Sequence, residues 1–168
     1  LASNPECVPD PEEPVISLEE LRQVFPAGTY SLAGTGADGA RYADKVELTY
    51  AIPAGPVLMS PNGDAAVDPD YPVEITWEPV TTTIAGLDPV GGTTPVTIAG
   101  YQVLVYDANA GESPQEFNVT VPGSESSVAV PTQFLQPDTD YTYEVLAIDD
   151  GGNQTISEGA FSTGPAAR

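Results

Sequence analysis

Carboxylates are the side chains of this sequence that could do chemistry, and some of them gather in turn-like stretches. They are Asp64, Asp68 and Asp70 in a stretch rich in Asn, Gly and Pro, and Asp149, Asp150 and Asn153 around two glycines. Oxygen ligands presented by turns are what Ca²⁺ prefers, although neither stretch has the spacing of an EF-hand loop. We therefore predict Ca²⁺ as the ion that these residues would bind.

The carboxylates do not indicate an enzyme. Glycoside hydrolysis needs two carboxylates held across a cleft, and close pairs such as Asp138 and Asp140 arise by chance among 25 acidic residues. Asp in a turn commonly accepts hydrogen bonds from backbone N–H groups instead. The sequence contains no His, which removes Ser–His and Cys–His nucleophiles. We expect no catalytic residues and no cofactor other than Ca²⁺.

The charge of the chain restricts its partners. The 25 Asp and Glu residues stand against 4 Lys and Arg, which gives a net charge of −21. Such a surface repels nucleic-acid phosphates and anionic lipid headgroups, and it attracts divalent cations and cationic partners. No apolar run approaches the roughly 20 residues that span a bilayer. The sequence therefore predicts no nucleic-acid partner and no membrane insertion.

Residues 1–16 form a Pro/Glu-rich arm. Proline lacks a backbone N–H and disfavours helical geometry in the residue before it, so we expect an extended conformation. The arm ends in Val15 and Ile16, which could add a strand to a sheet edge of another copy. The lone Cys7 cannot form a disulfide within its own chain, and pairing between chains, modification and no role are its open alternatives. A linker to a neighbouring domain is the alternative interpretation of this arm.

Residues 17–55 are expected to form a short helix followed by a β-hairpin. Ser17 and Glu20 have the spacing of a capping box, and apolar residues recur at helical spacing up to Pro26. Two runs of alternating apolar residues, 28–33 and 45–52, flank a glycine-rich turn. Because two strands alone are marginal in water, this hairpin must join the following domain, pack on the helix or pair with another chain.

Residues 56–168 contain seven short β-type runs separated by Gly, Pro, Asp and Asn. The expected strands are 56–60, 72–78, 98–107, 115–121, 127–131, 140–149 and 153–162. Seven strands with turn signals between them are typical of an antiparallel sandwich. The predicted fold class is therefore all-β, a seven-stranded sandwich preceded by one short helix and a β-hairpin.

This segment resembles the fibronectin type III family. The residues that carry the resemblance are Trp77 at the end of Val-Glu-Ile-Thr-Trp, Tyr101 at the start of Tyr-Gln-Val-Leu-Val-Tyr, the run from Leu135 to Tyr141 (Leu-Gln-Pro-Asp-Thr-Asp-Tyr), and Phe161. The third of these resembles the tyrosine corner of the family, which implies a hydroxyl that bonds back to the preceding turn. The resemblance implies an Ig-like sandwich over about residues 56–165, with Trp77, Tyr101, Leu135, Tyr141 and Phe161 in its core.

The expected function is that of a non-catalytic extracellular or cell-surface structural or adhesion module. Its expected partners are other copies of itself, in a filament or surface layer assembled through the N-terminal arm, or another extracellular protein. The alternative is an accessory spacer or weak glycan-binding module of a larger secreted enzyme or adhesin. A glycan partner would need exposed aromatic residues such as Tyr42, Tyr71 and Tyr106, since the only Trp is expected in the core.

Overall fold

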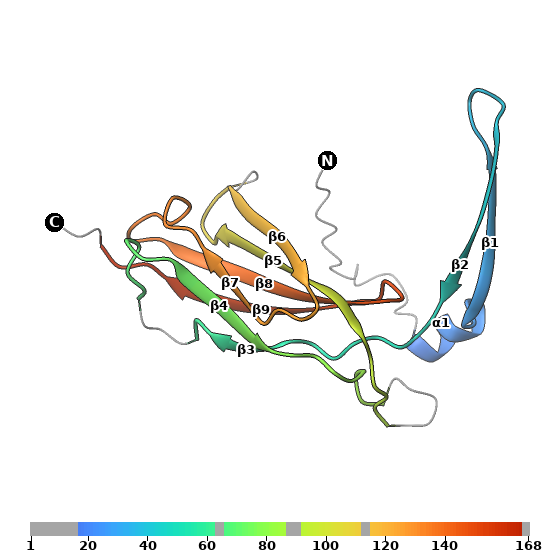
Figure 1. Ribbon diagram of the computed structural model, residues 1–168, viewed down its shortest axis with the longest axis horizontal. Helices are drawn as coiled ribbons and strands as arrows, with labels where there is room; N and C mark the ends of the chain where they lie inside the picture. Colours follow the sequence, from blue (N-terminus) through green and yellow to red (C-terminus); the bar gives the residue numbers. More distant parts are fainter. Residues whose placement is uncertain (1–16, 63–65, 87–91, 112–114, 166–168) are drawn as a thin grey trace. The chain divides into compact units, whose positions relative to one another are not determined.

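The computed structural model describes residues 17–62, 66–86, 92–111 and 115–165. The chain divides into two compact units, Leu1–Leu48 and Thr49–Arg168. Among the described residues, the first contains one helix and a two-stranded sheet, and the second contains two larger sheets (Figure 1). No helix in the described ranges is long and apolar enough to cross a membrane.

The second unit is the predicted seven-stranded antiparallel sandwich. Its strands are β3 (Val57–Ser60), β4 (Val73–Glu78), β5 (Ile98–Asp107), β6 (Glu116–Pro122), β7 (Ser127–Val130), β8 (Asp140–Asp149) and β9 (Gln154–Ser162). One sheet has the order β3-β4-β7 and the other the order β6-β5-β8-β9. Every strand pair is antiparallel, and irregular register occurs in the β3–β4 and β5–β8 pairs.

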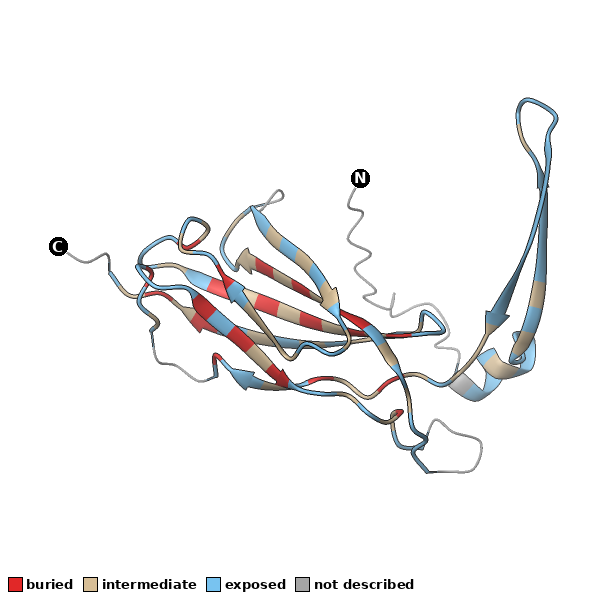
Figure 2. Ribbon diagram, in the orientation of Figure 1, coloured by how far each residue is buried: buried red, intermediate tan, exposed pale blue. Residues whose placement is uncertain are grey.

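The core lies between these two sheets and follows the alternation of the strands. Along β8, buried residues alternate with partly exposed ones, because successive side chains of a strand point to opposite faces (Figure 2). Trp77 contacts Tyr101 with ring centroids 5.1 Å apart, and Tyr141 stacks on Phe161 at 5.2 Å. Leu135 and these four aromatic residues are all buried in one apolar cluster.

The tyrosine corner is formed as the resemblance implied. The Tyr141 hydroxyl accepts a hydrogen bond from the backbone N–H of Gln136 at 2.8 Å. The same hydroxyl lies 3.5 Å from the carbonyl of Phe134, to which it donates. These bonds tie the turn before β8 to the interior of the sandwich, because the ring of Tyr141 is itself buried.

A second buried tyrosine, Tyr143, forms a hydrogen bond with the segment that follows β3. The Tyr143 hydroxyl donates to the carbonyl of Pro61 at 2.7 Å, and burial raises the pKa of this phenol. Gly159 lies opposite Tyr143 in the β8–β9 register. A Cβ at this glycine would overlap the Tyr143 ring, so the close approach of ring and strand requires glycine.

The boundary between the units lies between Leu48 and Thr49, several residues before the predicted boundary at residue 55. Residues 52–54 belong to the sandwich, because their backbone forms hydrogen bonds with residues of that unit. Ala54 N–H donates to the carbonyl of Thr82 at 2.9 Å, and Ile84 N–H donates to that of Ile52 at 3.0 Å. The backbone of this connection is thereby satisfied by the long segment that follows β4.

The helix of the first unit, α1 (Leu18–Val24), begins with the predicted capping box. The Ser17 side chain accepts from Glu20 N–H at 3.2 Å, and Ser17 N–H donates to Oε2 of Glu20 at 2.9 Å. The hydrogen bond from the Ser17 side chain lowers the pKa of Glu20, and its backbone N–H acts in the same direction. An ionised Glu20 in the first turn is also favoured by the helix dipole.

The hairpin consists of β1 (Gly28–Thr35) and β2 (Arg41–Leu48), paired from Gly28–Leu48 to Thr35–Arg41. The predicted second strand, 45–52, is therefore displaced along the chain. The alternation of apolar residues continues through Tyr50 and Ile52, but these residues lie beyond the last pair of the hairpin. An alternating pattern identifies a face and contains no signal for the residue at which strand pairing stops.

Candidate functional site

In the turn after β8, the carboxylate of Asp149 accepts hydrogen bonds from the same turn. Asp149 is buried, and its Oδ1 accepts from Asn153 N–H at 2.6 Å while Oδ2 accepts from the Asn153 side-chain amide at 3.2 Å. That amide also donates to the Thr49 hydroxyl at 2.8 Å. Asp150 is exposed. The turn thus brings Asp149 and Asn153 together as hydrogen-bond partners.

The turn before β4 has a similar internal arrangement. Oδ1 of Asp68 accepts from the backbone N–H of Asp70 at 3.0 Å, and the Asp68 carbonyl accepts from Tyr71 N–H at 3.2 Å. Asp64, the third predicted ligand, lies outside the described residues. Across the described ranges, no group of three or more Cys, Asp or Glu side chains is arranged to hold a metal ion. Calcium binding at these two turns stays a prediction.

The solvent face of the four-stranded sheet carries a cluster of acidic residues that the sequence reasoning missed. Glu144 of β8 lies directly opposite Glu158 of β9, and like charges in this arrangement are unfavourable. Tyr106 of β5 donates its hydroxyl proton to Glu144 at 3.1 Å. Burial, this hydrogen bond and the charges of Glu144, Glu158 and Glu116 raise the pKa of Tyr106 to about 12. Alternation along the strands places all four residues on one face and could have revealed the cluster.

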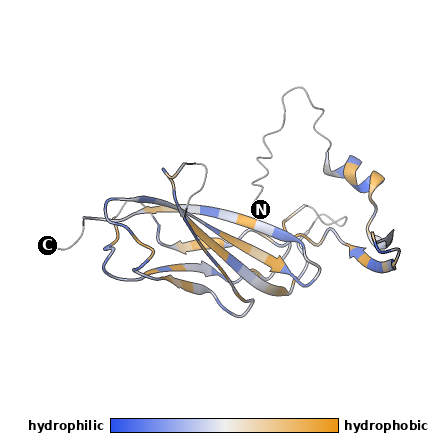
Figure 3. Ribbon diagram, turned by 90° about the horizontal axis from the view of Figure 1, so that it is seen from above, coloured by the Kyte–Doolittle hydropathy of each residue, from blue (hydrophilic) through white to orange (hydrophobic). Residues whose placement is uncertain are grey.

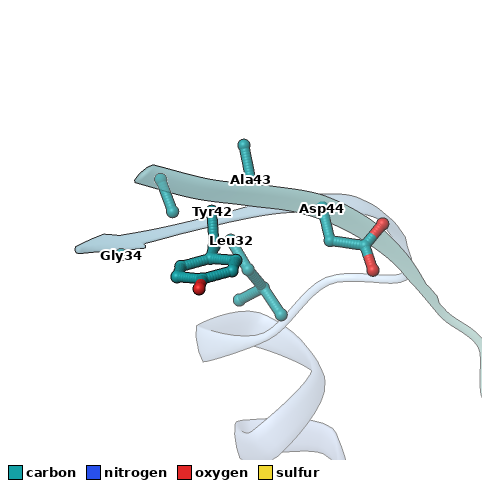
Figure 4. A pocket seen from close by; sticks show the side chains of 6 residues that line it. Leu32, Gly34, Tyr42, Ala43 and Asp44 are labelled. Atoms are coloured by element: carbon teal, nitrogen blue, oxygen red, sulfur yellow. The ribbon is translucent and has the colours of Figure 1, made fainter. Parts of the chain in front are cut away.

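The hairpin has one apolar face, which is left exposed within its own unit. Tyr30 pairs with Val46, Leu32 with Asp44, and Gly34 with Tyr42, so these residues share a face. The exposed fractions are 58% for Leu32, 62% for Tyr42 and 50% for Val46. Leu32 and Tyr42 project from one side of the hairpin and Ala43 from the other (Figure 4). A shallow hollow there is lined by Leu32, Ala33, Gly34, Tyr42, Ala43 and Asp44.

The helix adds to this exposed apolar surface. Leu21, Val24 and Phe25 are exposed, whereas the large apolar side chains of β4, β5 and β8 are mostly buried or partly buried. Hydrophobic and hydrophilic residues both occur along the hairpin strands (Figure 3), and the large apolar side chains Leu32, Tyr42 and Val46 are at least half exposed. An exposed cluster of apolar side chains on a small unit is typical of an interaction surface.

The opposite face of the hairpin is polar and contains two of the four basic residues of the protein. Arg41, Lys45 and Glu47 lie on this face of β2, across from Thr35, Ser31 and Thr29 of β1. Residues 17–48 contain three of the four basic residues and five acidic ones, while residues 49–168 contain sixteen acidic residues and one basic residue. The two units therefore differ strongly in charge.

The predicted assembly residues Val15, Ile16 and Cys7 lie outside the described residues. From the sequence we predicted that the hairpin could pair with another chain and that Tyr42 could be an exposed aromatic residue for a glycan, but Leu32 and Val46 were not predicted as contact residues. The alternation that exposes them was visible in the sequence. No feature of the sequence indicated that the apolar face of the hairpin would stay exposed in its own unit.

Solved structures similar to this chain are fibronectin type III domains. The third such domain of the human KIAA0343 protein is 17% identical, with a TM-score of 0.48, over 71% of this chain and 90% of that one. The fn3 domain of the human collagen alpha-1(XX) chain is 23% identical, with a TM-score of 0.44, over 69% and 87%. The chicken CNTN1 FN1–FN3 domains are 15% identical, with a TM-score of 0.42, over 82% and 44%.

No curated protein matches the sequence. The family model of the fibronectin type III domain matches residues 65–163, a segment that runs from just before β4 to the end of β9. The matched segment contains the tyrosine corner and the buried aromatic residues described above, and the chain belongs to the fibronectin type III domain family.

Proposed function

We propose that this protein is a non-catalytic structural or adhesion module that works outside the cell and assembles with further copies of itself through its N-terminal region. Fibronectin type III domains are generally non-catalytic modules and occur mostly in extracellular or cell-surface proteins. In this proposal the sandwich is the body of the subunit. Residues 1–48 form its contact region.

The observation that carries the proposal is the exposed apolar face of the helix–hairpin unit, which consists of α1 and the β1–β2 hairpin (described residues 17–48). Leu32, Tyr42 and Val46 are each at least half exposed on a two-stranded sheet. Two strands are marginal in water and gain stability when their apolar face or their edge is covered. A contact with another chain supplies that cover.

The absence of catalytic work is supported by what the carboxylates do. The Asp149 and Asp68 side chains accept hydrogen bonds from their own turns. Oδ1 of Asp140 accepts from the Ser162 hydroxyl at 2.6 Å, and Oδ2 lies 3.5 Å from the Asn109 side-chain amide. Turn formation and the packing of neighbouring strands account for these contacts without a substrate.

The arm and calcium complete the proposed assembly. Val15 and Ile16 would add a strand to a sheet edge of a neighbouring copy. The sandwich segment carries sixteen acidic residues and one basic residue, so two such surfaces repel each other. Ca²⁺ held between acidic turns such as Asp68–Asp70 would reduce this repulsion.

Light scattering on the full chain tests the proposal, with and without Ca²⁺. A variant lacking residues 1–16 is measured beside it. We expect assemblies larger than the monomer for the full chain, a smaller mass without the arm, and a larger mass in Ca²⁺ than in chelator. Far-UV circular dichroism of both proteins checks that the sandwich is still folded.

A monomeric full chain at every concentration, with and without Ca²⁺, would overturn self-assembly. The spacer role within a larger secreted protein would then take its place, as would weak glycan binding through exposed tyrosines such as Tyr42 and Tyr71. An unchanged mass after removal of residues 1–16 would assign the contact to the helix–hairpin unit alone.

A further inference from the structure

The outer edge of β2 has the properties of a pairing strand. In the described residues, β2 pairs only with β1, so its second edge has no strand partner there. An unpartnered edge presents backbone N–H and C=O groups that can bind an added strand. The apolar side chains Tyr42 and Val46 on the same strand are exposed. Backbone groups and apolar surface are thus available together.

The charges on β2 make the strand complementary to itself. The residues on its polar face are Arg41, Ala43, Lys45 and Glu47. In an antiparallel pair, residues directly opposite each other share a face and interact at short range. Two copies of β2 can therefore bring a basic residue of one against Glu47 of the other.

Like-charge contacts exclude most registers of such a pair. The two-fold registers that keep both apolar faces on the same side and pair most of the strand are centred on Ala43, Asp44, Lys45 or Val46. A register centred on Ala43 opposes Arg41 to Lys45, one centred on Asp44 opposes two aspartates, and one centred on Lys45 opposes two lysines. The register centred on Val46 opposes Lys45 to Glu47 twice and contains no like-charge pair.

Charge also favours a second helix–hairpin unit over the sandwich as the partner. Asp44 and Glu47 lie on β2, and the sandwich segment has sixteen acidic residues and a single basic one, Arg168, outside the described residues. Residues 17–48 hold five acidic and three basic residues, the most nearly balanced part of the protein. A second copy of this unit is consequently the least repelled partner for β2.

We propose that β2 pairs antiparallel with β2 of a second copy, centred on Val46, which joins two hairpins into a four-stranded sheet. This pairing rests on the self-assembly proposed above and names the surface through which it occurs. Each interface contains two Lys45–Glu47 contacts and a Val46–Val46 contact on the apolar side. A two-fold interface of this kind closes on itself and gives a dimer.

Charge reversal in the full chain tests the pairing. In Lys45→Glu, a glutamate faces Glu47 of the second copy at both contacts, and in Glu47→Lys two lysines meet in the same way. We expect each variant alone to raise the apparent dissociation constant about tenfold, measured by sedimentation velocity over a concentration series. An equimolar mixture of the two variants restores opposite charges at both contacts, so we expect it to associate as the unaltered protein does.

Arg41→Glu is the matched control. It makes the same change of charge on the same face of β2, but Arg41 has no charged partner in the register centred on Val46. We expect its dissociation constant to change less than threefold. If the full chain assembles and Lys45→Glu leaves association unchanged, or if mixing fails to restore it, the pairing is overturned while self-assembly stands. A full chain that is monomeric throughout overturns both.

Cross-linking gives an independent readout of the register. In a Cys7→Ser background, Val46→Cys places two thiols opposite each other, within the Cα separation that a disulfide needs. Tyr42→Cys, on the same face of the same strand, has its counterpart in the second copy too far away. We expect mild oxidation to give a covalent dimer for Val46→Cys alone. Efficient dimer formation by Tyr42→Cys instead would overturn the register.

Discussion

Apolar residues share one face of a strand in both the sandwich and the helix–hairpin unit, but their burial differs. On β8, Tyr143 and Val145 alternate with polar residues and are buried. On β2, Tyr42 and Val46 also share one face of the strand, with Asp44 between them, and are at least half exposed. The pattern therefore identifies the apolar face of a strand. It does not identify what covers that face.

The difference arises from the number of layers in each unit. The apolar faces of two sheets meet inside the sandwich and exclude water from both. The described part of the helix–hairpin unit has one sheet of two strands and one short helix, α1, in which Leu21 and Val24 are exposed. One layer cannot bury its own face, and this deficit is the physical basis of the proposed assembly.

The largest expected effect compares the same substitution in the two units. Val145→Ala leaves a cavity between two sheets and should lower the free energy of unfolding of the sandwich by about 2–3 kcal/mol. Val46→Ala, on an exposed face, should change it by less than about 0.5 kcal/mol. Urea unfolding followed by the fluorescence of Trp77, the only tryptophan, reports on the sandwich in both variants.

A large decrease in the free energy of unfolding for Val46→Ala in dilute solution would contradict this comparison, because it would mean that the apolar face of the hairpin is covered within the monomer. Measurements of association at high protein concentration give a second comparison of the two variants. If β2 pairs with a second copy there, Val46→Ala should also weaken association, while Val145→Ala should leave the dissociation constant of the folded protein unchanged.

An intermediate effect is expected from the tyrosine corner. Tyr141→Phe removes the acceptor of the Gln136 N–H and should lower the free energy of unfolding by about 1–2 kcal/mol. The ring stays in place, so the core packing of Phe161 against residue 141 is retained. Thermal unfolding by circular dichroism measures the loss. A stability equal to that of the unaltered protein would show that water replaces this hydrogen bond without cost.

The smallest expected effect is on how the stability of the sandwich depends on pH, through Tyr106 and the acidic residues around it. The pKa of Tyr106 is raised to about 12 in the folded protein, above the ordinary value of 10.0, so the folded state retains this proton where the unfolded chain has lost it. The contribution is complete below pH 10 and is lost as the pH rises from 10 towards 12. The Tyr106→Phe variant should therefore lose less stability over this interval.

Urea midpoints measured at a series of pH values between 9 and about 12 check this slope, with phenolate absorbance as an independent titration of the folded protein. Tyr42, on the exposed face of the hairpin, is the comparison residue, and Tyr42→Phe should leave the slope of the sandwich unchanged. Equal slopes for Tyr106→Phe and the unaltered protein would contradict the influence of the Glu144 cluster on this tyrosine.

Local features were predictable where the signal lies in neighbouring residues. The capping box of Ser17 and Glu20 needs only four consecutive residues, and it starts α1 where expected. The bounds of β5 and β8 agree with prediction because turn residues border their alternating runs. The end of β2 was not predictable, since Tyr50 and Ile52 continue the alternation while the backbone of Ile52 bonds to Ile84 across the sandwich.

By itself, the sequence determined the fold class, the family, the tyrosine corner and the strongly acidic charge, because each depends on residue types at short spacing. Only the tertiary structure decided that Asp149 is held by Asn153, that Glu144 opposes Glu158, and that Val46 stays exposed. The reason is that strand register and the number of covering layers are set by contacts between distant segments. Such contacts decide which side chains meet, and local spacing does not record them.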